Sequence, residues 1–279
     1  MEKFLSRISR NLYIVPGGYF ISKFLRIFFP SNSNIDPWRT ITFRGIRMKV
    51  DISKQMGKAI YWRGAHDWAP IFTLEKNLKS GDTFIDVGAN QGEYSLWAGR
   101  KVGNSGRVIS FEPMKDLFTQ LKENFDLNQN LKKVFTPVQI GLSNESGELV
   151  LYTKPGLNEG TNTIFGSDEF TIPLGKIKLE TLDSQVNHLG IQKLNMMKID
   201  VEGAELQVLK GGEETLKKFK PKLLIEINKD ACKSGGYEAE DILNFLTQFG
   251  YTFYKIGLRG KLSPITHLPE FCNILAVKI

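Results

Sequence analysis

The segment from Thr83 to Gly92, TFIDVGANQG, restricts the fold of this chain more than any other ten residues. Its apolar start, residues 83–87, is short and ends in glycine, which is typical of a buried parallel strand that enters a ligand-binding loop. Gly88 and Gly92 bracket the turn, and small residues there let the backbone approach a ligand closely. The next helix would direct its N-terminus at that ligand. The pattern therefore predicts a nucleotide-type site on a parallel α/β sheet.

The spacing within this loop narrows the kind of ligand. Dinucleotide-binding folds use G-x-G-x-x-G, whereas here Gly88 and Gly92 enclose Asn90 and are followed by Glu93. This G-x-N-x-G run disfavours a dehydrogenase and resembles the S-adenosylmethionine loop of class I methyltransferases. Asp86, at the end of the strand, and Glu93 would then lie near the amino group of the cofactor.

A second predicted strand, residues 107–111, ends in Glu112, which lies 20 residues after Gly92. An acid at the tip of the second strand is where nucleotide-binding folds hold the ribose hydroxyls. The alternative is a solvated acid at a strand end, but the loop and the acid together favour the ribose site.

Charged and apolar residues alternate within the segment 196–205. Lys198, Asp200 and Glu202 are separated by single apolar residues, which on a strand places the charges on one face or at its end. Burying three charges for packing alone would be costly, so the segment predicts a site. Lys198 could instead pair with Asp200, and Glu202 could cap a helix that begins at Gly203.

The other predicted elements alternate between strand and helix, which favours a doubly wound, mainly parallel sheet with helices on both faces. The helices are predicted at 67–79, 93–102, 115–128, 204–219 and 238–249. The strands are predicted at 134–140, 148–153, 172–180, 196–201, 222–227, 251–256 and 273–278.

Six blocks carry a family resemblance. They are FIDVGANQG, FEP (Phe111–Pro113), the LS within Gly141–Ser143, TLD (Thr181–Asp183), KIDVEGAE with VLKGG (Val208–Gly212), and LIEIN (Leu224–Asn228). In this order and approximate spacing, between Gly81 and Lys229, the chain resembles the FkbM family. These are S-adenosylmethionine-dependent methyltransferases, mostly O-methyltransferases of sugars and secondary metabolites.

The resemblance implies the class I methyltransferase fold, a seven-stranded sheet whose last strand is antiparallel. Residues 67–279 would form this S-adenosylmethionine-dependent domain. Residues 1–66 would form an extension of two helices and a β-hairpin at 38–52. The resemblance also places Leu142 and Ser143, after the third strand, beside the adenine.

Methyl transfer to oxygen requires an aligned acceptor and a group that takes its proton. We expect Asp200 to be the residue nearest the reacting centre and to act as general base, with Lys198 and Glu202 as further catalytic residues. A divalent metal is an alternative, because Asp200, Glu226 and Asn228 end neighbouring strands and oxygen ligands suit Mg²⁺. Otherwise Glu226 and Asn228 cap the strand and bind water.

Two further groups of residues could reach the acceptor. His66 and Asp67 precede the first helix of the domain, although a lone histidine is more often structural and Asp67 could be an N-cap. Asn162 and Thr163 belong to the long polar segment 144–180, a predicted acceptor-side loop.

Three functions from different classes fit these features. The first is an O-methyltransferase for a hydroxyl of a sugar, glycan or secondary metabolite. The second is an RNA or protein N-methyltransferase, which the sequence pI of about 9.2 allows. The basic residues, however, are concentrated in an apolar N-terminus, and no D/N-P-P-Y/F tetrapeptide follows the fourth strand, so nucleic acid is disfavoured. The third is a membrane-surface binding module that retains a cofactor fold, which the intact loop and acids disfavour.

The N-terminal residues 1–30 carry five basic side chains and one acidic side chain, and the whole chain has a net charge of +7. Lys23 and Arg26 interrupt the apolar runs, which disfavours a transmembrane helix or a signal peptide. Two basic amphipathic helices are predicted instead, at 2–13 and 19–29. They would either pack on protein, including a second copy of this chain, or lie on an anionic membrane surface.

The cysteine content indicates the compartment. The two cysteines, Cys232 and Cys272, are far apart and have no metal-like spacing. Free thiols are typical of a reducing compartment, which predicts a cytoplasmic protein, peripheral at the inner membrane surface if the N-terminal helices bind lipid.

Overall fold

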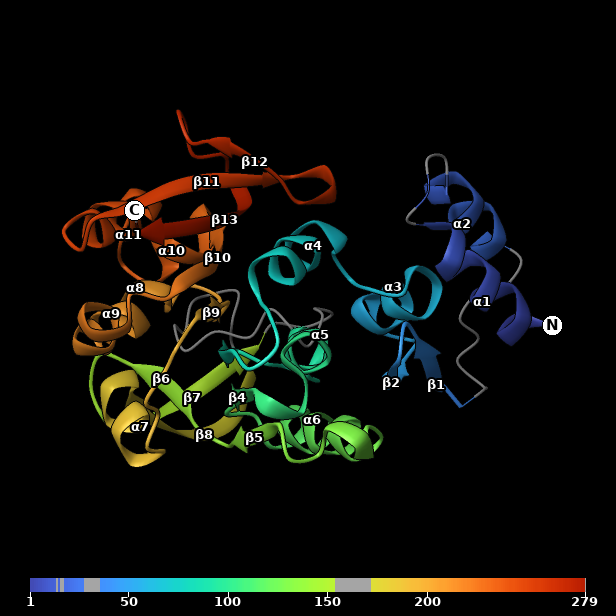
Figure 1. Cartoon of the computed structure of the whole chain (residues 1–279), viewed down its shortest axis with the longest axis horizontal. Coiled ribbons are helices and arrows are strands. Elements are labelled where there is room, and N and C mark those ends of the chain that lie inside the picture. The colour runs from blue at the N-terminus through green and yellow to red at the C-terminus, as the bar shows by residue number, and fades with distance from the viewer. Residues whose placement is uncertain (14, 16–17, 28–35, 154–171, 279) are drawn as a thin grey trace.

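The main sheet holds eight strands in the order β12-β11-β13-β10-β9-β3-β4-β5 (Figure 1). The computed structural model describes residues 1–13, 15, 18–27, 36–153 and 172–278. The strands of this sheet are β3 (Thr83–Val87), β4 (Arg107–Phe111), β5 (Phe135–Val138), β9 (Met196–Ile199), β10 (Lys222–Asn228), β11 (Tyr251–Gly257), β12 (Lys261–Pro264) and β13 (Phe271–Lys278).

The strand directions confirm the doubly wound arrangement. β3, β4, β5, β9 and β10 are parallel neighbours, and the last strand, β13, runs antiparallel between β10 and β11. The predicted number of seven strands is wrong by one, because β12 pairs antiparallel with the edge strand β11. The short turn η3 (Leu258–Gly260) returns the chain onto that edge.

Helices cover both faces of the sheet because successive strand residues point to opposite sides. Phe84 packs into the core shared with α4 (Trp68–Asn77), α5 (Glu93–Val102) and α6 (Lys115–Asp126). Ile85 packs into the opposite core. That second core is shared with α7 (Leu182–His188), α8 (Glu205–Lys210), α9 (Glu213–Phe219), α10 (Lys229–Ser234) and α11 (Ala239–Thr247). The short helix η1 (Gly103–Ser105) lies between α5 and β4, and η2 (Gln129–Leu131) lies between α6 and β5.

The helix predicted over 204–219 is two helices, α8 and α9, separated at Gly211 and Gly212. A Cβ atom at Gly211 would lie 2.0 Å from the backbone oxygen of Ser143, so glycine lets the chain pass against β6 (Gly141–Ser143). Close backbone approach of this kind is a common reason for glycine at a helix end.

The polar segment after β5 forms a second, three-stranded sheet with the order β6-β8-β7. β7 (Gly147–Thr153) and β8 (Ile172–Thr181) agree with the strands predicted at 148–153 and 172–180. Asn162 and Thr163, predicted on an acceptor-side loop, lie outside the described residues.

The predicted hairpin is present as β1 (Trp38–Phe43) and β2 (Ile46–Asp51), and Arg44 and Gly45 form its turn with φ values of 49° and 83°. Its apolar face joins the same core as α4 and α5. The ring centroid of Phe43 lies 6.1 Å from that of Trp68 and 6.4 Å from that of Trp97, and both ring pairs have edge-to-face geometry. The division of the chain at residue 66 stays a prediction.

Helices α1 (Glu2–Tyr13) and α2 (Gly18–Ile27) lie at one end of the molecule, against α3 (Gln55–Arg63) (Figure 1). Ser9 Oγ donates to the carbonyl oxygen of Trp62 at 2.7 Å, and Arg10 Nη1 donates to that of Tyr61 at 2.5 Å. Among the described residues, no helix is long and apolar enough to cross a membrane.

Candidate functional site

A cavity of about 460 Å³ opens at the carboxyl ends of β3, β4, β9 and β10. This edge of an open α/β sheet is where ligands bind. The wall includes the loops after these strands, the start of α3, and apolar residues of the three-stranded sheet such as Leu151 and Leu179. The volume suits a small organic ligand and part of a second one.

The loop between β3 and α5 is formed by residues in the left-handed conformation. Gly88, Asn90 and Gly92 have φ values of 77°, 50° and 91°. A Cβ atom at Gly88 would lie 1.8 Å from the backbone oxygen of Asp200, so only glycine lets β3 and β9 converge here. Asn90 holds the turn by accepting a hydrogen bond from the Gln91 N–H at 2.7 Å. The sequence prediction of a glycine loop in this place is confirmed.

Glu112, the predicted ribose ligand, is fixed below the loop with only 5% of its surface exposed. One carboxylate oxygen accepts the Asn90 N–H at 2.8 Å and the other accepts the Met114 N–H at 2.9 Å. Burial raises the pKa of Glu112 to about 7, although these two hydrogen bonds favour the charged form. The side chain lines the cavity and so can face a ligand.

Asp86 and Glu93, both predicted near the cofactor amino group, have different surroundings. Asp86 is fully buried and accepts the Ser95 hydroxyl at 2.6 Å, and it is not among the described residues that line the cavity. It therefore supports the site from beneath. Glu93 lines the cavity, accepts the His66 N–H at 2.7 Å, and has its pKa raised to about 8 by burial.

Of the two residues predicted beside adenine, one lines the cavity and the other does not. Leu142 is buried and lines the cavity together with Ile140. Ser143 lies outside the described lining, and its hydroxyl donates to the side-chain oxygen of Asn144 at 3.2 Å.

Lys198 and Asp200 form an ion pair, which was the alternative to a catalytic role for Lys198. Lys198 Nζ lies 2.9 Å from Asp200 Oδ2 and 3.9 Å from Asp86 Oδ1, and the lysine is 4% exposed. Burial disfavours its charge, but the carboxylates of Asp200 and Asp86 outweigh burial and raise the pKa of Lys198. The ammonium also sits 4.5 Å from the ring centroid of Tyr94, a cation–π contact within the cavity wall.

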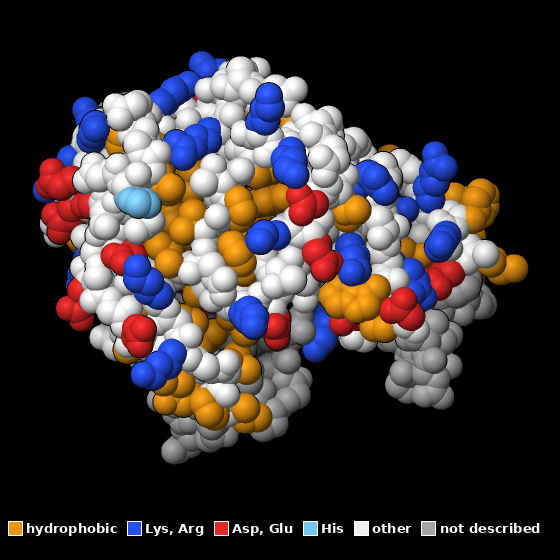
Figure 2. Space-filling view, turned by 90° about the horizontal axis from the view of Figure 1, so that it is seen from below, with side chains coloured by type: hydrophobic (Ala, Val, Ile, Leu, Met, Phe, Trp, Pro, Cys, Tyr) orange, Lys and Arg blue, Asp and Glu red, His pale blue; other side chains and the backbone are white. Residues whose placement is uncertain are grey.

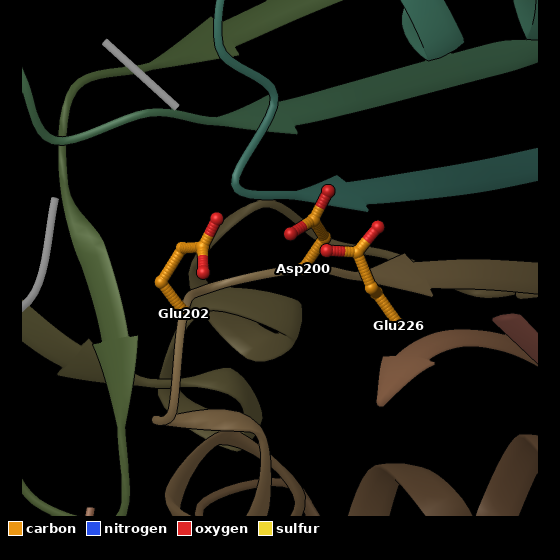
Figure 3. Close-up of side chains that lie close together, drawn as sticks. All are labelled: Asp200, Glu202 and Glu226. Atoms are coloured by element: carbon orange, nitrogen blue, oxygen red, sulfur yellow. The ribbon is translucent and has the colours of Figure 1, made fainter. Parts of the chain in front are cut away.

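Three carboxylates converge where β9 and β10 end: Asp200, Glu202 and Glu226 (Figure 3). Each offers an oxygen atom within 4.8 Å of the others. Burial, followed by repulsion from neighbouring carboxylates, raises the pKa of Glu202 to about 8 and that of Glu226 to about 9. Close like charges cannot all ionise, so the cluster retains a proton at neutral pH.

Glu202 points into this cluster because the loop that carries it is held by a different acid. Glu202 and Gly203 have positive φ values of 51° and 100°, and α8 begins at Glu205. The Glu205 carboxylate accepts the N–H groups of Val201 and Gly203, at 3.0 and 3.1 Å. The alternative in which Glu202 caps a helix starting at Gly203 is therefore wrong, and its carboxylate is available to a ligand.

Asn228, the third residue of the predicted metal set, caps a helix. Its side-chain oxygen accepts the Ala231 N–H at 3.3 Å as the N-cap of α10, although the residue also lines the cavity. Of the predicted metal set, the structure brings Asp200 and Glu226 together and puts Glu202 in the third place.

His66 and Asp67 both line the cavity, and Asp67 is the N-cap of α4, accepting the Ala69 N–H at 3.0 Å. Sequence reasoning missed the wall formed by α3 and the chain before it, whose lining residues are Asp51, Lys54, Gln55, Met56 and Gly57. The only signal for it was the hairpin that ends just before this segment.

The sheet order, the glycine loop after the first parallel strand and the acid after the second define an S-adenosylmethionine-dependent methyltransferase. The chain belongs to the family described as the methyltransferase FkbM domain, whose profile matches residues 86–253. The family resemblance inferred from the sequence is thereby confirmed.

Two curated relatives and one solved structure illustrate the similarity. Hexuronic acid methyltransferase AglP of Haloferax volcanii is 30% identical over 186 residues, which span 67% of this chain and 69% of that protein. Methyltransferase sdnD of Sordaria araneosa is 30% identical over 166 residues, which span 50% of this chain and 63% of that protein. The structure of methyltransferase FkbM from Methylobacillus flagellatus KT aligns at 17% identity with a TM-score of 0.48, over 71% of this chain and 44% of that chain.

Proposed function

We propose that this methyltransferase methylates a hydroxyl group of a sugar, a glycan or a secondary metabolite. The observation that carries the proposal is the carboxylate cluster at the end of β9 and β10, beside the Lys198–Asp200 ion pair. Carboxylates accept hydrogen bonds from hydroxyl groups and can take up a proton, and both properties suit a polyhydroxylated acceptor.

The cofactor would lie across the glycine loop. Its ribose hydroxyls would donate to Glu112, its adenine would contact Leu142, and its amino group would lie near Glu93. The sulfonium methyl group would then face Asp200, because the backbone of Gly88 packs directly on that of Asp200. This placement uses every predicted cofactor residue that lines the cavity and leaves Asp86, Gly92 and Ser143 in supporting positions.

The transfer would be an in-line displacement. The acceptor oxygen attacks the methyl carbon, the carbon–sulfur bond breaks, and its electron pair leaves with sulfur as neutral S-adenosylhomocysteine. The hydroxyl proton passes to Asp200 as general base, while Lys198 holds that carboxylate in place by their 2.9 Å contact. Glu226 and Glu202 would orient the acceptor by hydrogen bonds.

A carbohydrate acceptor gains support from one relative. The Haloferax volcanii relative is named as a hexuronic acid methyltransferase, so a sugar acid is the first acceptor to test for this chain. RNA or protein N-methylation remains the alternative, and it draws support only from the basic sequence pI of about 9.2.

The test is transfer of a labelled methyl group from S-adenosylmethionine to a panel of free sugars, uronic acids, polyols, amines and RNA. A product on a sugar or polyol that survives mild alkali is a methyl ether and supports the proposal. An alkali-labile product on a uronic acid is an ester and would contradict the choice of a hydroxyl acceptor. Transfer to amines or RNA alone would establish the alternative.

We also propose Mg²⁺ as a second component to test. Asp200, Glu202 and Glu226 each offer a hard oxygen donor within 4.8 Å of the others, and Mg²⁺ binds in proteins through one or two carboxylates together with several waters. A bound ion would lower the charge repulsion in the cluster and polarise an acceptor hydroxyl. Calorimetric titration with MgCl₂ should show binding to the wild-type protein and loss of it in Glu202→Gln. Equal heats for both proteins would remove the metal.

The location of the protein and the contacts of its N-terminal residues are also proposals. We propose a cytoplasmic location, supported by Cys232 and Cys272, which are free and buried. Residues 1–30 would contact a membrane surface or a second copy of the chain.

A further inference from the structure

Helices α1 and α2 are packed with much of their polar surface inward. In α1 the buried residues are Ser6, Ser9 and Arg10. In α2, Ser22 is buried at 2% exposure. A surface helix of a soluble protein normally turns its apolar stripe inward and its charges outward. Leu5 and Leu25 follow that rule only in part, being half-buried at the edge of the core.

The inward polar groups bind α3 through its backbone. Ser9 and Arg10 donate to the carbonyl oxygens of Trp62 and Tyr61 near the end of α3. Two buried polar atoms of the helix pair, Arg10 Nε and Ser22 Oγ, have no hydrogen-bond partner among the described residues. Polar contacts to the backbone of α3 therefore hold the helix pair together with the half-buried apolar residues Leu5, Tyr13 and Leu25.

The opposite face of each helix carries exposed aromatic and basic residues. On α1, Phe4 is 67% exposed and shares a face with exposed Arg7, three positions later. On α2, Phe20 and Phe24 are 72% and 60% exposed, and exposed Lys23 lies on the same face. Figure 2 shows hydrophobic side chains beside Lys and Arg side chains at the end of the molecule that these helices form.

Within the described residues of α1 and α2, acidic groups do not balance this charge. The one acid within the described residues of α1 and α2 is Glu2, and it pairs with Arg39 at 3.3 Å. The exposed basic residues on the two helices are Lys3, Arg7 and Lys23. The outer face of the pair is thus apolar and cationic.

We propose that the outer face of the α1–α2 pair docks on the surface of an anionic lipid bilayer, with Phe4, Phe20 and Phe24 inserted among the headgroups. Aromatic residues interleaved with lysine and arginine are the side chains that interfacial helices use. A symmetric contact between two copies of this face would bring like charges together, which disfavours self-association. The α3 helix that carries the pair begins at the cavity wall, so docking would also set the orientation of the cavity to the membrane.

The test is flotation of the full chain with vesicles of phosphatidylcholine, with and without about one third phosphatidylglycerol. The wild-type protein should float with the anionic vesicles and much less with the neutral ones. The double variant Phe20→Ser with Phe24→Ser, and separately Phe4→Ser, should lose about tenfold or more in partitioning. Lys23→Glu should bind the anionic vesicles less than the wild type does. High salt should weaken the binding of the wild type in the same way, because it screens exposed charges.

Leu258→Ser is the matched control, because Leu258 is 91% exposed and lies on η3, at the edge of the sheet. It should float like the wild type. Equal losses for Leu258→Ser and the phenylalanine variants would overturn the proposal. So would unchanged flotation of variants whose unfolding midpoints match the wild type. A phenylalanine variant that changes the sedimentation coefficient but not flotation would assign the face to a second copy instead.

Discussion

The two ends of the cavity are constructed by different means. At the cofactor end, backbone geometry dominates: three loop residues have positive φ, and one glutamate is fixed by two N–H groups. At the acceptor end, charged side chains from two strands and one loop face one another around a buried lysine. A backbone-built site tolerates few residue types at each position, whereas a charge-built site depends on the balance of several groups. Mutations should therefore act differently at the two ends.

The largest effect is expected at the acceptor end, from Asp200→Asn. Loss of a general base lowers turnover by about 10³-fold, while the affinity for S-adenosylmethionine should change by less than a factor of about three, because the residue keeps its size. Turnover with labelled cofactor and calorimetric titration measure the two quantities. Asp230→Asn, at an exposed acid in the first turn of α10, is the control and should leave both unchanged. Nearly normal turnover in Asp200→Asn would remove it from the role of base.

At the cofactor end, Gly88→Ala should destabilise the fold itself. The new Cβ atom would meet the backbone of Asp200 at 1.8 Å in a residue with a φ of 77°. Strain and overpacking together should lower the free energy of unfolding by about 3 kcal/mol.

Gly236→Ala separates strain from contact, since Gly236 has a φ of 80° and no atom within 4 Å of the added group. Its cost should be about 1 kcal/mol. Urea unfolding of both variants measures the difference. Equal costs would show that the contact between Gly88 and Asp200 does not restrict the loop.

Glu112→Ala should weaken cofactor binding by about 1–3 kcal/mol, because ribose hydroxyls and two backbone N–H groups lose their acceptor. Titration with S-adenosylhomocysteine and its 2′-deoxy form tests the ribose contact. The wild type should distinguish the two ligands and the variant should not. Glu123→Ala, at an exposed acid on α6, is the control. A variant that still prefers the ribose form would place the hydroxyls elsewhere.

The last prediction concerns how the stability of the protein changes with pH through Glu93. Its pKa is about 8 in the folded protein against an ordinary value of 4.5. Below pH 4.5 the carboxyl is protonated in both states. Between 4.5 and 8 the unfolded chain ionises first, so wild-type stability falls as pH rises, and above 8 the loss is constant.

Glu93→Gln cannot ionise and should gain about 3 kcal/mol of stability relative to the wild type as the pH rises from 5 to 8. Urea unfolding at several pH values measures this difference. Glu145→Gln, at an exposed residue, should follow the wild-type curve. If the stability of Glu93→Gln changed with pH as that of the wild type does, Glu93 would be ionised in the folded protein.

The cofactor end could be predicted from the sequence because its determinants are local. The glycines, Asn90 and the acid after the second strand are read directly from neighbouring positions. The structure gives the loop its left-handed residues and puts Gly88, Asn90 and Glu112 in the cavity wall. The ion pair of Lys198 and Asp200 was also local, two residues apart on one face of a strand. These features depend on the preference of glycine and asparagine for a turn and on the alternation of side chains along a strand. Both can be recognised from residue types at neighbouring positions.

The acceptor end depended on distant parts of the chain. Glu226 reaches Asp200 because β10 pairs beside β9, which the alternation of strands and helices led us to expect. Glu202 points inward because Glu205 holds its loop, which no pattern in the sequence indicated. Asp86 was expected at the ligand and lies beneath it, since burial is not visible from spacing.

The sequence by itself determined the class of protein, because the loop, the ribose acid and the strand motifs each require particular residue types within a few positions. Tertiary structure alone decided the eighth strand, the break between α8 and α9 and the wall contributed by α3. It also decided which face of α1 and α2 meets solvent. Helical periodicity shows that a helix has two faces, but the surface it packs against selects the one that is buried.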